Sequence, residues 1–357
     1  MRIGIFDPYL DSLGGGEKYM LTAASCLSKE HEVFVFWDQD LLGEAAKKFN
    51  LDLSRVKVVE NIFNYNLPAK LYKSKEYDAI FFLSDGSLPF VHTKLFVHFQ
   101  FPVEWVNPQS FMNKKKIKRV EKFICNSKYT KDFIDKEFGV SSIVLYPPTY
   151  EKKDFPKINI TKKKDYILNV GRLSKLADGT IFKKQDFMIN AFKKIVNRGI
   201  SDWELVMVVS VLERDRSLLN YLKNMIKGYP IKIYENIPYE DLLEIYQDAK
   251  IYWHASGFGE NLIKHPEKAE HFGITTVEAM INGLVPVVIN EGGQKEIVQD
   301  GKNGYLFDNE KALVERTVSL IENKTLLEKL SKEALKRGND FSSDIFCRNV
   351  NKIFKYE

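Results

Sequence analysis

The sequence predicts an α/β protein built from two doubly wound domains, each a mostly parallel sheet covered by helices on both faces. Three observations predict this fold class. Short, continuously apolar runs alternate with amphipathic segments, which is typical of buried parallel strands between helices. The alternation stops at Tyr146-Pro147-Pro148 and begins again at Tyr166. The length of 357 residues suits two domains of roughly 150 to 180 residues each.

In the first half, apolar runs predict strands, and apolar residues recurring on one side predict helices. The predicted strands are 3–6, 33–37, 56–59, 79–83, 95–98 and 123–125, and the predicted helices are 17–27 and 127–138. Residues 149–164 carry prolines and a lysine-rich patch with little periodicity, so we expect a linker there.

The second half repeats the same order of strand, turn and helix. The predicted strands are 166–170, 205–209, 231–234, 251–253 and 285–288, and the predicted helices are 185–196, 239–247 and 275–282, with a helical segment from 311 to the end. Sheets of this kind bind ligands at the carboxyl ends of their strands. We therefore expect the two halves to share a ligand cleft.

Composition and termini narrow the class of protein. A net charge of +5 is small for a nucleic-acid binder of this length and suits a basic cleft for an anionic small molecule. Cys26, Cys125 and Cys347 are far apart without a CxxC spacing, so we expect reduced thiols and neither a disulfide framework nor a zinc site. The N-terminus lacks the pattern of a signal peptide, and no apolar run is long enough to span a bilayer, which predicts a cytoplasmic protein.

The first ligand-binding motif is Gly14-Gly15-Gly16-Glu17, which follows the first strand and opens the first helix. Glycines there allow backbone amides to approach a phosphate, and a helix N-terminus favours negative charge. A flexible loop with an incidental glycine run is the alternative. The motif lacks the GxGxxG spacing of dinucleotide-binding folds, which disfavours a dehydrogenase.

The second motif is Asn169-Val170-Gly171-Arg172-Leu173, which ends the first strand of the second half, and Lys183-Lys184 stand before the next helix. An arginine at the carboxyl end of a strand is expected to project into the cleft. Its guanidinium binds a diphosphate in a bidentate manner, and a lysine adds a point charge. A surface arginine with a solvated lysine pair is the alternative.

The third motif runs from Glu270 to Met280. Gly273 is expected to open a helix, with Glu270 in the loop before it and Glu278 in its second turn. Free amides near Gly273 and Ile274 then face a phosphate, while the two carboxylates reach other parts of the same ligand. Because the helix also has an apolar side, a solvated position for Glu278 is the alternative.

Two groups of residues raise the question of a metal ion, and we expect none at either. Asp38-Gln39-Asp40 has the Asp-x-Asp pattern that holds a cation in some enzymes, but it lies between a strand and a helix and is predicted to be a turn and helix cap. His254, His265 and His271 lack the HExxH spacing of a zinc site.

Together these motifs resemble the retaining GT-B glycosyltransferases of family four. Glu270 and Glu278 form the E-x7-E pattern of that family within an E-x-FG-x-x-x-x-EAM frame. Further matching segments follow in the family's order over nearly the whole chain, at 14–17, 126–130, 146–148, 171–173, 183–192, 292–296 and 300–307.

The resemblance implies a role for each matching residue. Arg172 and Lys183 match the pair that neutralises the donor diphosphate, and the length of the preceding loop leaves Lys184 as an alternative to Lys183. Glu278 matches the residue that binds the ribose hydroxyls. Glu270 matches the residue that contacts the hydroxyls of the donor sugar.

The resemblance extends to the first domain and to a second glycine pair. Gly15 and Gly16 match the loop on the phosphate side, and Gly292 and Gly293 match a loop that lines the sugar pocket. His98, at the end of a predicted strand, looks like the histidine near the transferred sugar, with a core histidine as the alternative.

The implied architecture is a GT-B fold with two Rossmann-like domains facing a central cleft. The acceptor-side domain comprises 1–150 and is completed by the closing helix at 341–357, and the donor domain comprises 163–338. Two segments are longer than the family's pattern, 174–182 and 256–269, so His265 or Glu260 is a further candidate for the site.

The expected function is metal-independent, retaining transfer of a hexose from GDP-mannose or a UDP-hexose to a hydroxyl of a glycan or lipid-linked acceptor, without a cofactor or nucleic-acid partner. His98, Arg172, Lys183 and Glu270 are the expected catalytic residues. Two alternatives stay open: a sugar-nucleotide epimerase, and a catalytically silent sugar-nucleotide-binding protein. The basic stretch 111–119 predicts either a solvated charged face or a peripheral contact with the inner face of a membrane.

Overall fold

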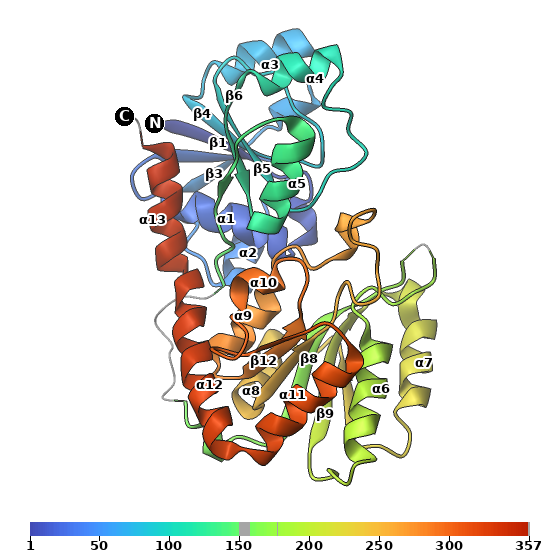
Figure 1. Cartoon of the computed structure of the whole chain (residues 1–357). Helices are drawn as coiled ribbons and strands as arrows, with labels where there is room; N and C mark the ends of the chain where they lie inside the picture. Colours follow the sequence, from blue (N-terminus) through green and yellow to red (C-terminus); the bar gives the residue numbers. More distant parts are fainter. Residues whose placement is uncertain (150–157, 177, 356–357) are drawn as a thin grey trace. The chain divides into compact units, whose positions relative to one another are not determined.

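The computed structural model describes residues 1–149, 158–176 and 178–355 and divides the chain into two compact units (Figure 1). Unit 1 comprises Met1–Glu151 together with Phe341–Glu357, and unit 2 comprises Lys152–Asp340. Half of the predicted linker 149–164, residues 150–157, lies outside the described residues. Among the described residues, no helix is both long and apolar enough to cross a membrane.

Unit 1 is built on a parallel sheet of seven strands in the order β3-β2-β1-β4-β5-β6-β7. Its strands are β1 (Arg2–Phe6), β2 (Glu32–Phe36), β3 (Val56–Val59), β4 (Ala79–Leu83), β5 (Lys94–Phe99), β6 (Val120–Cys125) and β7 (Ile143–Val144). The strand order reverses between β1 and β4. That crossover is where folds of this kind bind ligands.

Helices cover both faces of this sheet, as the continuously apolar strands require. They are α1 (Gly15–Leu27), α2 (Leu42–Phe49), α3 (Leu67–Ser74), α4 (Phe111–Ile117), α5 (Lys128–Phe138) and α13 (Ser343–Phe354). Neighbouring strand residues point to opposite faces. Accordingly, Val33 and Val35 belong to one core with α1 and α13, while Phe34 and Phe36 belong to a second core with α5.

The closing helix α13 completes unit 1 by packing against α1. Its buried residues Phe346, Val350 and Phe354 recur every four positions and form one apolar stripe. That spacing places them on one face of the helix, which enters the core beneath α1. Tyr19 of α1 meets the ring of Phe346 edge-on.

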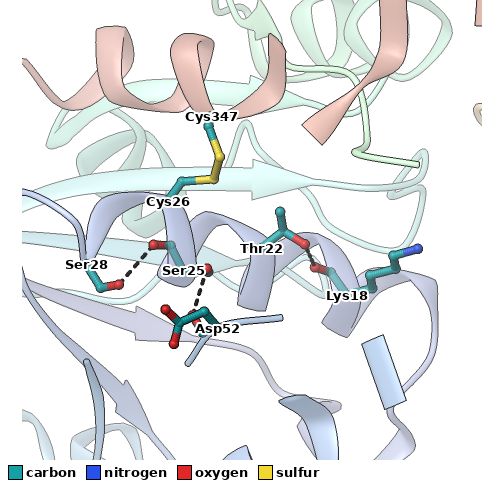
Figure 2. The surroundings of a disulfide bond; sticks show 7 residues. All are labelled: Lys18, Thr22, Ser25, Cys26, Ser28, Asp52 and Cys347. Carbon is teal, nitrogen blue, oxygen red and sulfur yellow. Dashed lines mark hydrogen bonds between the residues drawn. A yellow bond between two sulfur atoms is a disulfide. The ribbon is translucent and has the colours of Figure 1, made fainter. Parts of the chain in front are cut away.

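The expectation of three reduced thiols is wrong for two of them. Cys26 of α1 and Cys347 of α13 form a disulfide, with their Cα atoms 5.2 Å apart (Figure 2). Only Cys125 is a free thiol, and it is buried. The two bonded cysteines are 321 residues apart in the sequence. No local spacing indicates such a pair, because the contact exists only once α13 returns to unit 1.

Unit 2 is built on a parallel sheet of six strands in the order β10-β9-β8-β11-β12-β13. Its strands are β8 (Tyr166–Leu173), β9 (Glu204–Val211), β10 (Ile231–Glu235), β11 (Ile251–His254), β12 (Val285–Ile289) and β13 (Tyr305–Phe307). The crossover lies between β8 and β11. The prediction of two doubly wound parallel sheets is confirmed.

The helices of unit 2 pack on the sheet, and most of them also contact a neighbouring helix. They are α6 (Gln185–Val196), α7 (Arg216–Met225), α8 (Tyr239–Asp248), α9 (Ile274–Ile281), α10 (Gln294–Ile297), α11 (Glu310–Glu322) and α12 (Lys324–Gly338). Helix α6 contacts α7 and α11, whereas α9 contacts α10 and α12. Alternate strand residues such as Leu205, Met207 and Val209 join the core shared with α6 and α7.

Candidate active site

The crossover of unit 2 brings together residues from two strand ends and two loops. Arg172 lies near the carboxyl end of β8, and His254 is the last residue of β11. Lys183 precedes α6, and Glu270 lies in the loop before α9. Carboxyl ends of strands that flank a crossover are the usual ligand site of such sheets.

Glu270 is the centre of this site. Its Oε2 accepts hydrogen bonds from Lys183 Nζ at 2.5 Å and His254 Nε2 at 2.7 Å. Burial alone would raise the pKa of Glu270, but the charge of Lys183 and the bond from His254 outweigh burial and hold that pKa well below its usual range. The carboxylate is therefore ionised and oriented, as a group that accepts hydrogen bonds from sugar hydroxyls must be.

His254 is held as a neutral ring. Burial lowers its pKa, although Glu270 acts in the opposite direction. With Nε2–H donating to Glu270, the other nitrogen, Nδ1, is buried and has no hydrogen-bond partner among the described residues. The ring therefore fixes the direction of the carboxylate without adding a charge.

Arg172 provides a positive charge that no described residue neutralises. Its side chain is exposed and makes no ion pair or hydrogen bond with any residue that the structure describes. The stem of Lys183 lies against Gly171, the residue that precedes Arg172, because a Cβ added there would stand 3.5 Å from Lys183 Cγ. Lys183 therefore has Glu270 as its anionic partner, whereas Arg172 has none within the described ranges.

The two adjacent lysines differ in where they point. Lys183 reaches Glu270, whereas Lys184 Nζ lies 2.5 Å from Glu260 Oε1, with both side chains nearly buried. The cause is the backbone of Lys184, whose φ of +56° places it in the left-handed region at the N-cap of α6. This turn separates the two side chains, and only Lys183 belongs to the Glu270 cluster.

Glu278 lies in the second turn of α9 and is partly buried. The hydroxyl of Tyr246 donates to Glu278 Oε2 at 3.2 Å. Burial, and then the charge of Glu278, raises the pKa of Tyr246 well above its usual range and that of Tyr239 to about 12. Both tyrosines therefore stay protonated around the carboxylate.

Glycines shape the backbone around Glu270 and the start of α9. Gly273 is the N-cap, with a φ of +114°, and no side chain caps the helix amides there, including that of Ile274. A Cβ on Gly292 would lie 2.3 Å from the carbonyl oxygen of Glu270. The amide of Gly293 donates to that same oxygen at 2.8 Å. In the structure this glycine pair supports the Glu270 loop, and its contact with a sugar stays a prediction.

The glycine motif of unit 1 has a carboxylate where a phosphate was expected. Gly15 and Gly16 begin α1, and the amide of Gly14 donates to Glu17 Oε2 at 2.5 Å. A Cβ on Gly16 would lie 2.5 Å from Gln100 Oε1, so this turn is closely packed. The phosphate role of Gly15 and Gly16 stays a prediction.

His98 lies inside unit 1 and not at its surface. Its ring has no exposed area and stacks on Tyr19 with 4.1 Å between ring centres. Nδ1 is 3.2 Å from the carbonyl oxygen of Ile124, and Nε2 has no hydrogen-bond partner among the described residues. Burial lowers the pKa of His98 to about 3. A sugar contact would require the ring to become uncovered, so this role stays a prediction.

The candidate metal ligands are engaged elsewhere. Asp38 accepts from Asn64 at 3.0 Å, and Asp40 accepts from the amide of Leu42 at 3.0 Å, as in a local turn. His265 lies 3.4 Å from Glu267 at an exposed position. Within the described ranges, no three His, Cys, Asp or Glu side chains are grouped as a metal site would need.

Sequence reasoning missed the roles of His254 and Tyr246. The sequence suggests His254 only as a metal ligand, although it directly follows the predicted strand 251–253 and is the last residue of β11. The rule that drew attention to Arg172 at a strand's carboxyl end applies equally to His254. Tyr246 had no comparable signal, since its contact with Glu278 depends on how α8 lies beside α9.

Comparison with known proteins assigns the chain to a family. A sequence model described as "Glycosyl transferases group 1" matches residues 151–337. Spore coat protein SA of Bacillus subtilis is 27% identical over 201 residues, covering 54% of this chain and 49% of that protein. A human GDP-Man:Man(3)GlcNAc(2)-PP-Dol alpha-1,2-mannosyltransferase is 24% identical over 239 residues, covering 61% and 45%. The match therefore spans about half the length of these relatives.

Among solved structures, Anabaena Alr3699/HepE, crystallised in complex with UDP and glucose, superposes with a TM-score of 0.71 and 17% identity, covering 99% of each chain. This similarity confirms the predicted GT-B fold. The family match includes the entire Arg172, Lys183, Glu270 and Glu278 site. The chain therefore belongs to the glycosyl transferases group 1 family.

Proposed function

We propose that this chain is a retaining glycosyltransferase that moves a hexose from a nucleotide-diphosphate sugar to a hydroxyl of a glycan or lipid-linked acceptor, without a metal ion. The observation that carries the proposal is the cluster at the crossover of unit 2. There His254 and Lys183 hold an ionised Glu270, and Arg172, near the carboxyl end of β8, has no anionic partner among the described residues.

The two cationic side chains would stabilise the negative charge that forms in the reaction. As the bond from the anomeric carbon to the phosphate oxygen breaks, its electron pair moves onto the diphosphate. Arg172 and Lys183 stabilise that added charge, together with the uncapped amides near Gly273 and Ile274. Preorganised charges of this kind supply the role that a divalent cation has in metal-dependent enzymes.

The carboxylates hold the uncharged parts of the donor. Glu270 accepts hydrogen bonds from the hydroxyls of the transferred sugar, and Glu278 accepts them from the ribose. The acceptor oxygen attacks the anomeric carbon from the face that the diphosphate leaves, and its proton passes to the departing phosphate oxygen. Attack on the same face retains the anomeric configuration.

The donor base is narrowed by the relatives but not by the site residues. The Anabaena structure contains UDP and glucose, and the human relative's name includes GDP-Man. UDP-glucose and GDP-mannose are therefore the first donors to test. An epimerase would alter its sugar nucleotide with no acceptor present, so incubation without an acceptor separates the two activities.

Thermal unfolding with UDP, GDP, ADP and NAD, each with and without EDTA, tests the proposal. A ligand at 100 times its Kd adds about 2.7 kcal/mol to the free energy of unfolding. We expect a shift with one nucleoside diphosphate that EDTA does not change. A shift with NAD alone, or none with any nucleotide, would contradict the proposal, and loss of the shift in EDTA would contradict metal independence.

Helix α4 carries the proposed membrane contact. None of its residues is buried, and Phe111 and Met112 are 71% and 52% exposed. Lys114, Lys115 and Lys116 follow on the same short helix, with Lys115 Nζ 4.2 Å from the centre of the Phe111 ring. Exposed apolar groups beside clustered lysines are what an anionic lipid surface binds, at about 1 kcal/mol for each lysine.

Sedimentation with phosphatidylglycerol vesicles tests this contact. Changing Lys114, Lys115 and Lys116 together to Gln is expected to weaken binding by at least tenfold. Lys329, Lys332 and Lys336 of α12, which are also exposed, provide a matched control triple. Unchanged sedimentation of the α4 variant, or an equal loss in both triples, would show that α4 is a solvated face.

A further inference from the structure

The two segments that exceed the family's pattern are joined to one another in unit 2. Asp178 of the first and Glu260 of the second both bind Lys268, each at 2.9 Å. Glu260 also binds Lys184. The side chains of Lys184, Glu260 and Lys268 are only 10–16% exposed. A nearly buried ion network of this kind fixes the two segments as one structure.

Together with α6 and α7, these segments line an open pocket of about 630 Å³, here called the α6–α7 pocket. Thr180 and Ile181 of the first segment line one side, and Phe258 of the second segment lines another. Asp186 of α6 and Tyr221 of α7 complete the principal lining. This size and mixture of apolar and polar groups suit a small-molecule site.

The pocket is separate from the donor site. Neither Arg172, Lys183, Glu270 nor Glu278 lines it. Lys184 does line it, and its neighbour Lys183 binds Glu270. The two sites therefore meet at one turn of the chain, so a ligand in the pocket lies beside the donor without occupying its place.

The lining favours a neutral saccharide over an anion. Glu260 neutralises Lys184, and Asp186 and Lys175 contribute one charge of each sign to the lining. The carboxylate of Asp186 makes no bond with any residue in the described ranges, so it can accept from hydroxyls. The ring of Tyr221 is 51% exposed. An exposed ring face beside a carboxylate suits a sugar, whose apolar face stacks and whose hydroxyls donate.

We propose that the α6–α7 pocket binds a neutral saccharide unit of the acceptor. The proposal rests on the proposed transferase function and assigns part of acceptor recognition to the two long segments. The acceptor then contacts unit 2 next to the turn that holds Lys183. Relatives that have shorter segments would lack this contact.

The test uses the full chain and a panel of p-nitrophenyl glycosides, the α and β forms of glucose, galactose, mannose and N-acetylglucosamine. Saturation-transfer NMR detects binding, and calorimetry gives Kd. We expect at least one glycoside to bind, and Tyr221→Ala and Asp186→Asn each to weaken it by about tenfold. Tyr234→Ala, which removes a 40% exposed ring outside the pocket, is the control.

The outcomes separate this proposal from the proposed function. If no glycoside binds, or if both pocket variants bind as wild type does, the pocket is not a saccharide site. Binding of inorganic phosphate that Tyr221→Ala abolishes would instead indicate an anion site and overturn the proposal. Nucleoside diphosphate shifts that persist in both pocket variants would show that the donor site is intact. If wild type shows no shift with any nucleoside diphosphate, that result contradicts the transferase proposal alone.

Discussion

The two units present opposite charges at equivalent places in the same topology. In unit 1, Asp7 and Asp85 come after the crossover strands β1 and β4. The carboxylate of Glu17 accepts a hydrogen bond from the amide of Gly14. In unit 2, the crossover carries Arg172 and Lys183. Burial, and then Glu17, raises the pKa of Asp7 to about 7, whereas the cluster around Glu270 lowers a carboxylate pKa.

This difference shows that topology supplies the place for a ligand, while a few side chains decide its charge. An anionic diphosphate is favoured beside Arg172 and Lys183 and disfavoured beside Asp7 and Glu17. A neutral, hydroxyl-bearing ligand is compatible with the acidic crossover of unit 1. The comparison therefore supports placing the donor diphosphate in unit 2.

Arg172→Ala tests the comparison between the two crossovers most strongly. Removing one preorganised cation from the developing charge is expected to lower kcat by about 10³-fold. Steady-state transfer assays with UDP-glucose or GDP-mannose measure the effect. Arg198→Ala, at an exposed position after α6, is the control and is expected to retain activity. Near-normal turnover of Arg172→Ala would remove this residue from the mechanism.

The disulfide distinguishes the two units by stability. Because Cys26 and Cys347 both belong to unit 1, a reductant is expected to destabilise unit 1 by about 2–4 kcal/mol and to leave unit 2 unchanged. Hydrogen exchange followed by mass spectrometry resolves amides of α1 and α13 from those of α6 and α9. In Cys347→Ser the reductant should have no effect. Equal loosening of both units in wild type would contradict this assignment.

Ionisation of Asp7 and of Glu270 should change the free energy of unfolding with pH in opposite directions. The folded pKa of Asp7 is about 7, above its usual 3.8, so the free energy of unfolding falls as pH rises between these values. Asp7→Asn cannot ionise and should gain about 4 kcal/mol relative to wild type from pH 4 to pH 8.

The pKa of Glu270 is lowered in the folded protein. Its contribution to the free energy of unfolding is therefore present above the usual pKa of 4.5 and is lost as pH falls through the folded pKa. Glu270→Gln should therefore be less stable than wild type at pH 7, with a difference that shrinks in acid. Denaturant titrations at several pH values measure both variants. If the difference in free energy of unfolding from wild type changes with pH in the same direction for Asp7→Asn and Glu270→Gln, the charge comparison is refuted.

The sequence predicted the elements whose signal is local. Apolar runs such as 79–83 and 205–209 became β4 and β9, and the glutamate pair identified the loop before α9 and its second turn. The helices α2, α3 and α7, of 8, 8 and 10 residues, were not named, although Leu218, Leu219 and Leu222 of α7 recur at helical spacing. Their formation depends on the sheet that they cover.

Features that arise from contacts between distant segments could not be predicted. The Cys26–Cys347 bond requires α13 to pack on α1, and the orientation of Glu270 depends on His254, which lies 16 residues earlier at the end of β11. The choice between Lys183 and Lys184 depends on one left-handed backbone position. The burial of His98 beneath Tyr19 likewise follows from packing, whereas its position at a strand end suggested a site.

The central claim is that the basic crossover of unit 2 binds the diphosphate of the donor. Calorimetric titration with UDP and GDP, and with uridine and guanosine, in EDTA tests it for wild type, Lys183→Met and Lys184→Met. We expect wild type to bind one diphosphate at least about 100-fold more tightly than its nucleoside, Lys183→Met to lose about tenfold of this preference, and Lys184→Met to keep it. An unchanged preference in Lys183→Met, or an equal loss in both variants, would contradict the account.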